Sequence, residues 1–394
     1  MAPIPPSTRR RLVGALLPLA VAAAACSGTP TVSRAAPSTS ATAPAVASPR
    51  SPAPSTPAPA PSAGPAQPGE PVVVASGLEA PWGLAFLPDR SALVSERDTA
   101  RVVQVPAQGG DPVEVARVQE AAPAGEGGLL GLAVSPTYAS DRQVYAYVTT
   151  AEDNRIVRFR LPAQAGPAQT EPVLTGIPRG VIHNGGRIAF GPDGSLYAGT
   201  GDTGDTSLAR DHDSLGGKVL RMTAGGEPVD GADSLVFSVG HRNVQGLAFD
   251  EDDRLWATEF GQSSFDEVNQ VDEGDDGGWP EVEGAGDGGG RFAAPAVTWT
   301  TSEASPSGVA VAGGSLWVAA LRGERLWQVP LDGRGGTGEP VARYEGDFGR
   351  LRTVVRAPDG TLWMTTSNRD GRGDPADADD RVLRLTLAPT TSTS

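Results

Sequence analysis

The sequence has very little cysteine, histidine and lysine, and few long apolar stretches. Among 394 residues there is one cysteine, Cys26, so no disulfide can form within the chain. Lys218 is the single lysine among 32 basic residues, and three residues are histidines. The net charge of −15 opposes binding to nucleic acid, whose phosphates need a basic surface. We therefore expect no nucleic-acid partner.

One apolar run, residues 12–25, follows three arginines at residues 9–11. It is too short to cross a bilayer with ease and is typical of a signal peptide. Three alanines precede Cys26, which resembles a bacterial lipobox. We expect residues 1–26 to be a lipoprotein signal peptide and Cys26 to be lipidated. The protein would then be extracytoplasmic and held at the bacterial cell membrane by a lipid anchor alone. The alternative is ordinary cleavage, with Cys26 incidental.

The two ends of the remaining chain differ in composition from its middle. Residues 27–69 are almost entirely Pro, Ala, Ser, Thr and Gly. Such a segment cannot bury a core, so it is expected to be a disordered tether. The tail, residues 387–394, is expected to be disordered as well. One folded domain is predicted over residues 70–386.

A repeated pattern fills that domain. Each copy has a small-apolar alternating stretch, a turn such as Pro-Asp-Gly, a second alternating stretch and a further strand. The copies begin near residues 83, 131, 187, 246, 308 and 353. Period-two alternation with Asp-Gly turns predicts antiparallel strands. Six units of about fifty residues predict an all-β fold, a six-bladed β-propeller. A pair of β-sandwiches is the alternative, and six similar units argue against it.

Residues whose side chains could take part in catalysis lie in one stretch of the repeats. Residues 183–187 read His-Asn-Gly-Gly-Arg, and residues 240–246 read Gly-His-Arg-Asn-Val-Gln-Gly. Asp-Glu-Val-Asn follows at 266–269 and Gly-Gly-Trp-Pro at 277–280. A histidine base, fixed arginines and a turn flanked by carboxylates are typical of an active site. Each motif alone is weak evidence.

In this order, the motifs resemble those of the glucose/sorbosone dehydrogenase family, the soluble quinoprotein type of aldose sugar dehydrogenase. The resemblance covers about residues 71–386. It implies a six-bladed propeller that uses pyrroloquinoline quinone (PQQ) and calcium. The implied reaction is oxidation of an aldose at C1 to the lactone, with hydride passing to the quinone and electrons leaving to an external acceptor.

The resemblance assigns three catalytic residues. His183 matches the general base that takes the C1 hydroxyl proton, a role that suits an imidazole. Asp202 matches the carboxylate that orients this base. Arg242 matches the arginine that reaches the reactive carbonyl of the quinone, where a fixed cation stabilises developing negative charge.

Further residues match the positions that bind PQQ, whose three carboxylates need cations. Asn243 follows Arg242 in its motif. The matching cations are Arg322, where relatives commonly have lysine, and Arg350 and Arg352. Glu126 stands where the family often has glutamine. A carboxylate facing an anionic cofactor is unfavourable, so either Glu126 is paired with a cation or the affinity for PQQ is weakened.

The calcium ligands implied by the resemblance are mainly carbonyl oxygens, which suit this hard cation. The active-site ion would bind the carbonyls of Gly261 and Gln262, where relatives have Gly-Pro, and glutamine is expected to loosen that turn. Glu267 and the Gly277 carbonyl match a second, structural calcium site. The alternative is that this acidic loop is merely solvated.

Two other functions stay open at this point. One is a non-catalytic propeller that acts as a binding lipoprotein, and the other is a calcium-dependent lactonase on a similar propeller. A lactonase needs several side-chain carboxylates at a metal on the channel axis, whereas these motifs supply one base and several arginines. The identity of the sugar would depend on loops at the channel mouth, such as residues 204–214 and 284–292.

Overall fold

The structure of the protein is a computed structural model that describes residues 64–286 and 288–389. The predicted signal peptide, Cys26, most of the predicted tether and residues 390–394 lie outside the described residues. Within the described ranges, none of the helices combines the length and the apolar character needed to cross a membrane.

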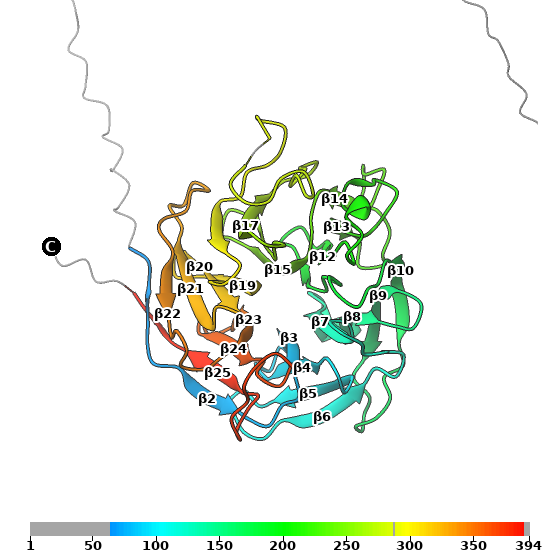
Figure 1. Ribbon diagram of the computed structural model, residues 1–394. Coiled ribbons are helices and arrows are strands. Elements are labelled where there is room, and N and C mark those ends of the chain that lie inside the picture. The colour runs from blue at the N-terminus through cyan, green and yellow to red at the C-terminus, as the bar shows by residue number, and fades with distance from the viewer. Residues whose placement is uncertain (1–63, 287, 390–394) are drawn as a thin grey trace, which may run out of the picture. The chain divides into compact units, whose positions relative to one another are not determined.

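Six antiparallel sheets of four strands each surround a central axis, so the predicted six-bladed β-propeller is confirmed (Figure 1). The first blade consists of β3 (Pro81–Phe86), β4 (Ala92–Glu96), β5 (Arg101–Val105) and β6 (Val113–Arg117). The second consists of β7 (Leu129–Val134), β8 (Gln143–Thr149), β9 (Asn154–Arg160) and β10 (Glu171–Ile177). The third consists of β11 (Ile188–Phe190), β12 (Leu196–Gly199), β13 (Val219–Met222) and β14 (Val236–Ser238).

The last three blades complete the ring. The fourth consists of β15 (Val244–Phe249), β16 (Leu255–Glu259), β17 (Phe265–Val271) and β18 (Val297–Thr300). The fifth consists of β19 (Pro306–Ala312), β20 (Ser315–Ala320), β21 (Arg325–Pro330) and β22 (Val341–Arg343). The sixth consists of β23 (Leu351–Arg356), β24 (Leu362–Thr366), β25 (Val382–Leu385) and β2 (Val72–Ala75). Because β2 precedes the first blade in sequence but pairs with β25, it ties the two ends of the domain together.

The blades hold together through apolar clusters that join neighbours. One cluster packs side chains of the first blade, such as Leu93, against side chains of the second, such as Phe159. Three tryptophans, Trp256, Trp317 and Trp363, are fully buried in the corresponding layers of later blades. Burial of apolar area on both faces of each sheet is therefore the main source of stability in a chain without disulfides.

Helical structure is slight in the described chain. It consists of a four-residue helix, α1 (Tyr138–Asp141), and a 3-10 helix, η1 (Thr206–Arg210). Asp205 caps the latter by accepting a hydrogen bond from the Ser207 N–H at 3.1 Å.

The ordered domain extends beyond both predicted boundaries. A short strand, β1 (Gln67–Pro68), pairs with β26 (Leu387–Ala388). Ala66 is buried, its N–H donates to the Gly313 carbonyl at 2.8 Å, and its carbonyl accepts from Gln328 Nε2 at 2.9 Å. The boundary predicted at residue 70 is therefore too late and that at residue 386 is too early. Backbone hydrogen bonds order these segments, which composition alone does not reveal.

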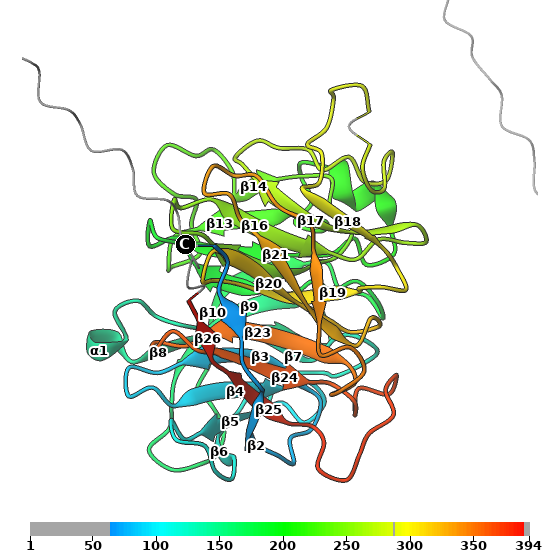
Figure 2. The same ribbon diagram turned by 90° about the vertical axis from the view of Figure 1, so that its left-hand side faces the viewer.

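The two ends of each innermost strand face opposite ends of the propeller. At the carboxyl end, tight turns lead to the second strand, with Gly191 N–H donating to the Ser195 carbonyl and Ala357 N–H to the Thr361 carbonyl, both at 2.8 Å. These are the Pro-Asp-Gly turns of the repeat. At the amino end, longer connections arrive from the preceding blade, and the side view separates these two faces (Figure 2). Of the residues singled out from the sequence, His183, Arg242 and Arg350 lie on those longer connections. Asp202, Gly261 and Arg322 lie between the second and third strands of a blade, at the same end.

Candidate active site

Two connections between blades and one connection within the third blade, between β12 and β13, meet at the amino ends of the inner strands. Gly201 and Asn243 form an isolated antiparallel bridge, and Asp202 N–H donates to the Arg242 carbonyl at 2.8 Å. Gly185 N–H donates to Asn243 Oδ1 at 3.0 Å. A Cβ on Gly201 would collide with the His183 carbonyl, so only glycine permits this approach. The structure thus brings His183, Asp202, Arg242 and Asn243 together.

His183 and Asp202 form a buried pair. His183 Nδ1 lies 2.6 Å from Asp202 Oδ1, and the histidine backbone has a left-handed φ of 52°. The other carboxylate oxygen, Oδ2, accepts from Trp279 Nε1 at 2.9 Å, and Gly204 N–H donates to Oδ1 at 2.8 Å. Burial alone would raise the pKa of Asp202, but the hydrogen bonds from His183, Gly204 and Trp279 lower the pKa below its usual value. The carboxylate therefore stays ionised and fixes the imidazole.

Glu126 contacts the same histidine through its backbone. Glu126 Oε2 accepts from the His183 N–H at 2.8 Å, and Oε1 accepts from Arg372 Nη2 at 2.9 Å. In addition, Glu126 N–H donates to the Val181 carbonyl at 2.9 Å. Of the two outcomes considered for this carboxylate, pairing with a cation is the one observed. Glu126 holds the loop that carries His183 in its left-handed conformation.

Arg242 and Asn243 carry buried donors without partners. Arg242 Nη1 donates to the Phe260 carbonyl at 3.0 Å, and its guanidinium lies over the Trp279 ring, 5.5 Å from the centroid. Within the described residues, Arg242 Nε and Asn243 Nδ2 are buried and have no hydrogen-bond partner. An unpaired buried donor is costly unless a bound group satisfies it. These two atoms therefore indicate where a ligand with acceptor oxygens would bind.

Arg350 and Arg352 lie on the sixth blade beside Asp370. Arg350 Nη2 is 2.9 Å and Arg352 Nη2 is 3.4 Å from Asp370 Oδ2. Arg352 Nη1 also donates to Gln245 Oε1 at 2.8 Å, while its Nε is buried without a partner in the described chain. Burial lowers the pKa of Arg352 to about 9, and Asp370 opposes that effect. Two cations share one carboxylate here, which leaves positive charge for an anionic ligand.

Arg322 lies apart from these pairs. Its side chain is exposed, and no hydrogen bond or ion pair to it is found among the described residues. Its neighbour Leu321 lines a small cavity together with Glu126, Arg352 and Arg372, so Arg322 stands next to that cavity. Arg322 therefore lies near other predicted cofactor residues, with no hydrogen bond or ion pair to them in the described chain.

Three of the four predicted calcium ligands line one small cavity. Gly261, Glu267 and Gly277 border a space of about 10 Å³, close to the volume that one water needs. Arg242, Glu259 and Glu283 complete its polar walls. Burial, and then the nearby Glu259 carboxylate, raise the pKa of Glu267 to about 7. Side chains alone form no cluster of three or more metal-binding residues in the described ranges, so a cation here would need carbonyl ligands as well.

Gln262 is exposed and does not border that cavity. Its N–H donates to Glu283 Oε1 at 2.7 Å, and the N–H groups of Ser263, Ser264 and Phe265 donate to the same oxygen at 2.8, 2.9 and 3.2 Å. Proline would lack the first of these donors. The expectation that glutamine loosens the turn is therefore wrong, because Glu283 organises it through four backbone hydrogen bonds.

Sequence reasoning missed several residues that shape the site. Trp279 belongs to the quoted Gly-Gly-Trp-Pro motif, and its place in that motif was the available signal for it. Gln245 follows in the same motif as Arg242 and Asn243, so that motif could also have identified it. Asp370, Arg372 and Glu283 belong to no recognised motif, and only the folded chain brings them to the site.

The other two histidines differ from His183. His241 is buried between Glu259 Oε2 and Ser238 Oγ, each 2.8 Å from a ring nitrogen. Both ring nitrogens are therefore occupied, and its role is to hold the backbone next to Arg242. His212 is exposed on the loop after η1. Only His183 keeps one ring nitrogen without a side-chain partner at the channel mouth, among the described histidines.

Comparisons with known proteins bear on the family of the chain. The profile of the glucose/sorbosone dehydrogenase family matches residues 78–381. A solved structure of the PQQ-bound form of an aldose sugar dehydrogenase from Streptomyces coelicolor is 54% identical. The alignment covers 82% of this chain and 100% of that one, with a TM-score of 0.78.

Two curated relatives are more distant. Quinoprotein glucose dehydrogenase B of Acinetobacter calcoaceticus is 30% identical over 61% of this chain, and the match spans 59% of the relative's length. Aldose sugar dehydrogenase YliI of Escherichia coli K12 is 27% identical over 76% of this chain and 90% of the relative. The family that the motifs predicted is confirmed: this chain belongs to the glucose/sorbosone dehydrogenase family.

Proposed function

We propose that this protein is a PQQ-dependent sugar dehydrogenase that oxidises an aldose at C1 to the lactone and passes the electrons to an external acceptor. The observation that carries the proposal is the His183–Asp202 pair, set beside buried donors that lack partners. The family match and the PQQ-bound relative from Streptomyces coelicolor support it.

His183 acts as the general base. Asp202 is ionised and accepts from Nδ1–H, so the lone pair of the imidazole is at Nε2. Nε2 takes the proton of the C1 hydroxyl, and Asp202 stabilises the imidazolium that results. PQQ, when bound, supplies the acceptor for the hydride that leaves C1. Trp279 fixes Asp202 from the far side, which limits rotation of the pair.

The arginines of the site bind and orient the cofactor. Arg242 Nε, Asn243 Nδ2 and Arg352 Nε are three buried donors that have no partner among the described residues, and PQQ carries three carboxylates and carbonyl oxygens that suit them. The Arg242 guanidinium lies over the ring of Trp279, whose Nε1 donates to Asp202, so this cation is near the His183–Asp202 pair. It would stabilise negative charge that develops next to the base.

Calcium would bind near Gly261, Glu267 and Gly277. The cavity that these residues line has a buried carboxylate whose pKa is raised to about 7, which a bound cation would lower again. The Gly261 carbonyl would supply a hard oxygen ligand there, whereas Gln262 does not border the cavity. Calcium would thus also fix the turn that carries the Phe260 carbonyl against Arg242.

We further propose an extracytoplasmic location for this activity, with Cys26 as the lipid anchor. The support is the apolar run and the three alanines before Cys26, all outside the described residues.

The test is reconstitution of the purified protein with PQQ and calcium, followed by dye reduction with a panel of aldoses and lactones. The expected result is aldose-dependent dye reduction that requires PQQ. Lactone hydrolysis without dye reduction would instead identify a lactonase. The absence of both activities would support the non-catalytic binding protein.

A further inference from the structure

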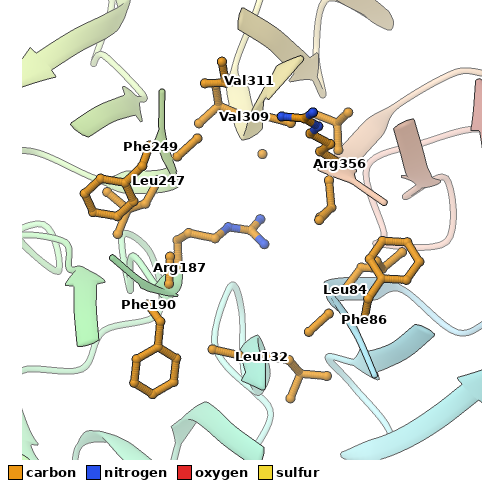
Figure 3. Close-up of a pocket in the computed structure, with 18 of the residues that line it drawn as sticks. Leu84, Phe86, Leu132, Arg187, Phe190, Leu247, Phe249, Val309, Val311 and Arg356 are labelled. Atoms are coloured by element: carbon orange, nitrogen blue, oxygen red, sulfur yellow. The ribbon is translucent and has the colours of Figure 1, made fainter. Parts of the chain in front are cut away.

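A second cavity lies at the other end of the channel, at the carboxyl ends of the inner strands. It has a volume of about 670 Å³, within the range of small-molecule sites. Its walls are mainly apolar, and Figure 3 shows three phenylalanine rings around a central opening. The apolar wall residues include Phe86, Leu132, Phe190, Leu247, Phe249 and Val309. No residue of the proposed catalytic set lines this cavity.

One buried cation points into this cavity. The Arg187 guanidinium extends toward the centre of the opening (Figure 3), although the residue is only 8% exposed. Its Nε donates to the Gln245 carbonyl at 2.8 Å, its Nη2 donates to Thr353 Oγ1 at 2.9 Å, and it stacks 4.4 Å from the Trp82 ring centroid. These contacts fix its position and leave Nη1 directed at the cavity.

The charge of Arg187 has no counter-ion. Within the described chain it forms no ion pair, and the residues that line the cavity include no aspartate or glutamate. The second cation of the lining is Arg356 at the rim, whose side chain is 53% exposed and 4.0 Å from Glu251. Burial, and then the charge of Arg352, lower the pKa of Arg187 to about 9, so it is still charged at neutral pH. A buried cation without a partner attracts an anion.

We propose that this cavity binds a small monoanion with an apolar body, of the aryl- or branched-alkyl-carboxylate class. The planar fork of Arg187 suits a carboxylate at the bottom of the cavity, and the rings and aliphatic walls suit the apolar body above it. A free sugar would leave its hydroxyls unpaired against these walls. A polyanion would place its further charges against apolar side chains, because the second cation is at the rim.

The site is separate from the proposed catalytic end. Arg187 contacts Trp82, Gln245 and Thr353. Arg352 contacts the same layer, 5.8 Å from the Trp82 ring centroid, but it lines the small cavity beside Glu126 and does not border the Arg187 cavity. Binding of a carboxylate at Arg187 therefore does not require PQQ or calcium. Its test can be carried out without any measurement of sugar oxidation.

The experiment is isothermal titration calorimetry of the full-length protein with 3-phenylpropionate and with its neutral counterpart, 3-phenylpropan-1-ol. We expect the acid to bind at least tenfold more tightly than the alcohol. In Arg187→Gln this preference should fall to less than twofold. The matched variant Arg356→Gln, which removes the exposed rim cation, should weaken the binding of the acid less than threefold. Equal binding of the two probes to the unaltered protein, or no binding of either, would overturn the proposal.

Thermal unfolding shows whether Arg187→Gln is folded. A second variant tests the cavity without changing Arg187. Ala189→Phe adds a ring to the cavity wall and keeps Arg187. It should weaken the binding of both probes at least tenfold, and the acid should still bind more tightly than the alcohol. Unchanged binding in Ala189→Phe would place the probes elsewhere and overturn the proposal as well.

Discussion

The two ends of the central channel are built from the same six strands but have opposite chemistry. At the amino ends, two connections between blades and the β12–β13 connection within the third blade bring His183, Asp202 and Arg242 together with several charged partners. At the carboxyl ends, short turns leave an apolar funnel with Arg187 at its base. Tight hairpin turns are constrained by strand register, whereas longer connections can vary freely. The difference teaches that the proposed catalytic groups lie on the longer connections at the amino end.

The largest expected effect is the loss of rate when His183 is replaced. It tests whether catalysis takes place only at the amino end of the channel. His183→Gln should lower the rate of dye reduction by roughly 10²- to 10⁴-fold, the usual contribution of a general base. PQQ binding, followed by its absorbance, should be nearly intact because the arginines hold it. His212→Gln, which changes an exposed histidine, is the matched control and should keep the full rate. A rate above about a tenth of that of the unaltered protein would remove His183 from the role of base.

Asp202→Asn should be less damaging than His183→Gln. The amide keeps the shape of the side chain, but its single oxygen can accept only on one side, so its NH₂ group faces either Trp279 Nε1–H or the imidazole, and it no longer stabilises the imidazolium. We expect a loss of roughly 10- to 100-fold, below the roughly 10²- to 10⁴-fold contributed by a general base itself. Steady-state rates of both variants with one aldose make the comparison. A greater loss in Asp202→Asn would transfer the role of base to the carboxylate.

Glu267 should make calcium binding depend on pH. Its pKa in the folded protein is raised to about 7 from an ordinary 4.5. Between these values the folded state keeps a proton that the unfolded state has lost, so without calcium the free energy of unfolding should fall as pH rises. Calcium competes with that proton, so its affinity should weaken by up to roughly tenfold per pH unit below 7.

Calorimetric titration of calcium and thermal unfolding, each from pH 5 to 8, measure these two dependences. In Glu267→Gln the pH dependence of calcium affinity should be largely absent, and the fall in stability with pH should be smaller but not lost, because burial also raises the pKa of Asp266 to about 6. Glu273→Gln removes a carboxylate that is 64% exposed and should leave them unchanged. Calcium affinity that does not vary with pH in the unaltered protein would exclude Glu267 as a ligand.

The smallest effect is expected at Glu126. Glu126→Gln keeps an oxygen that can accept from the His183 N–H and loses the ion pair with Arg372, whose side chain is 57% exposed. An exposed ion pair contributes about 1 kcal/mol or less, so the maximal rate should change by no more than roughly fivefold. Glu126→Ala, which removes the acceptor, should lose more. Equal rates in the two variants would show that this hydrogen bond does not position the base.

The sequence predicts the fold because each blade repeats the same alternation and turn. It also predicts the residues on local motifs, such as His183 and Arg242. Asp370 and Arg372 escaped prediction because they reach the site only when the sixth blade closes the ring. Glu283 escaped because its partners are backbone N–H groups, which have no signature in side-chain identity. The ordered residues 64–69 escaped because their backbone, and not their composition, makes the contacts.

The most direct measurement is a titration of PQQ into the purified protein, with and without calcium, followed by PQQ absorbance and aldose-dependent dye reduction in the same sample. The account predicts that one PQQ binds per chain when calcium is present, that binding weakens when calcium is removed, and that dye reduction rises in proportion to bound PQQ. Equal, negligible binding in both samples would contradict it.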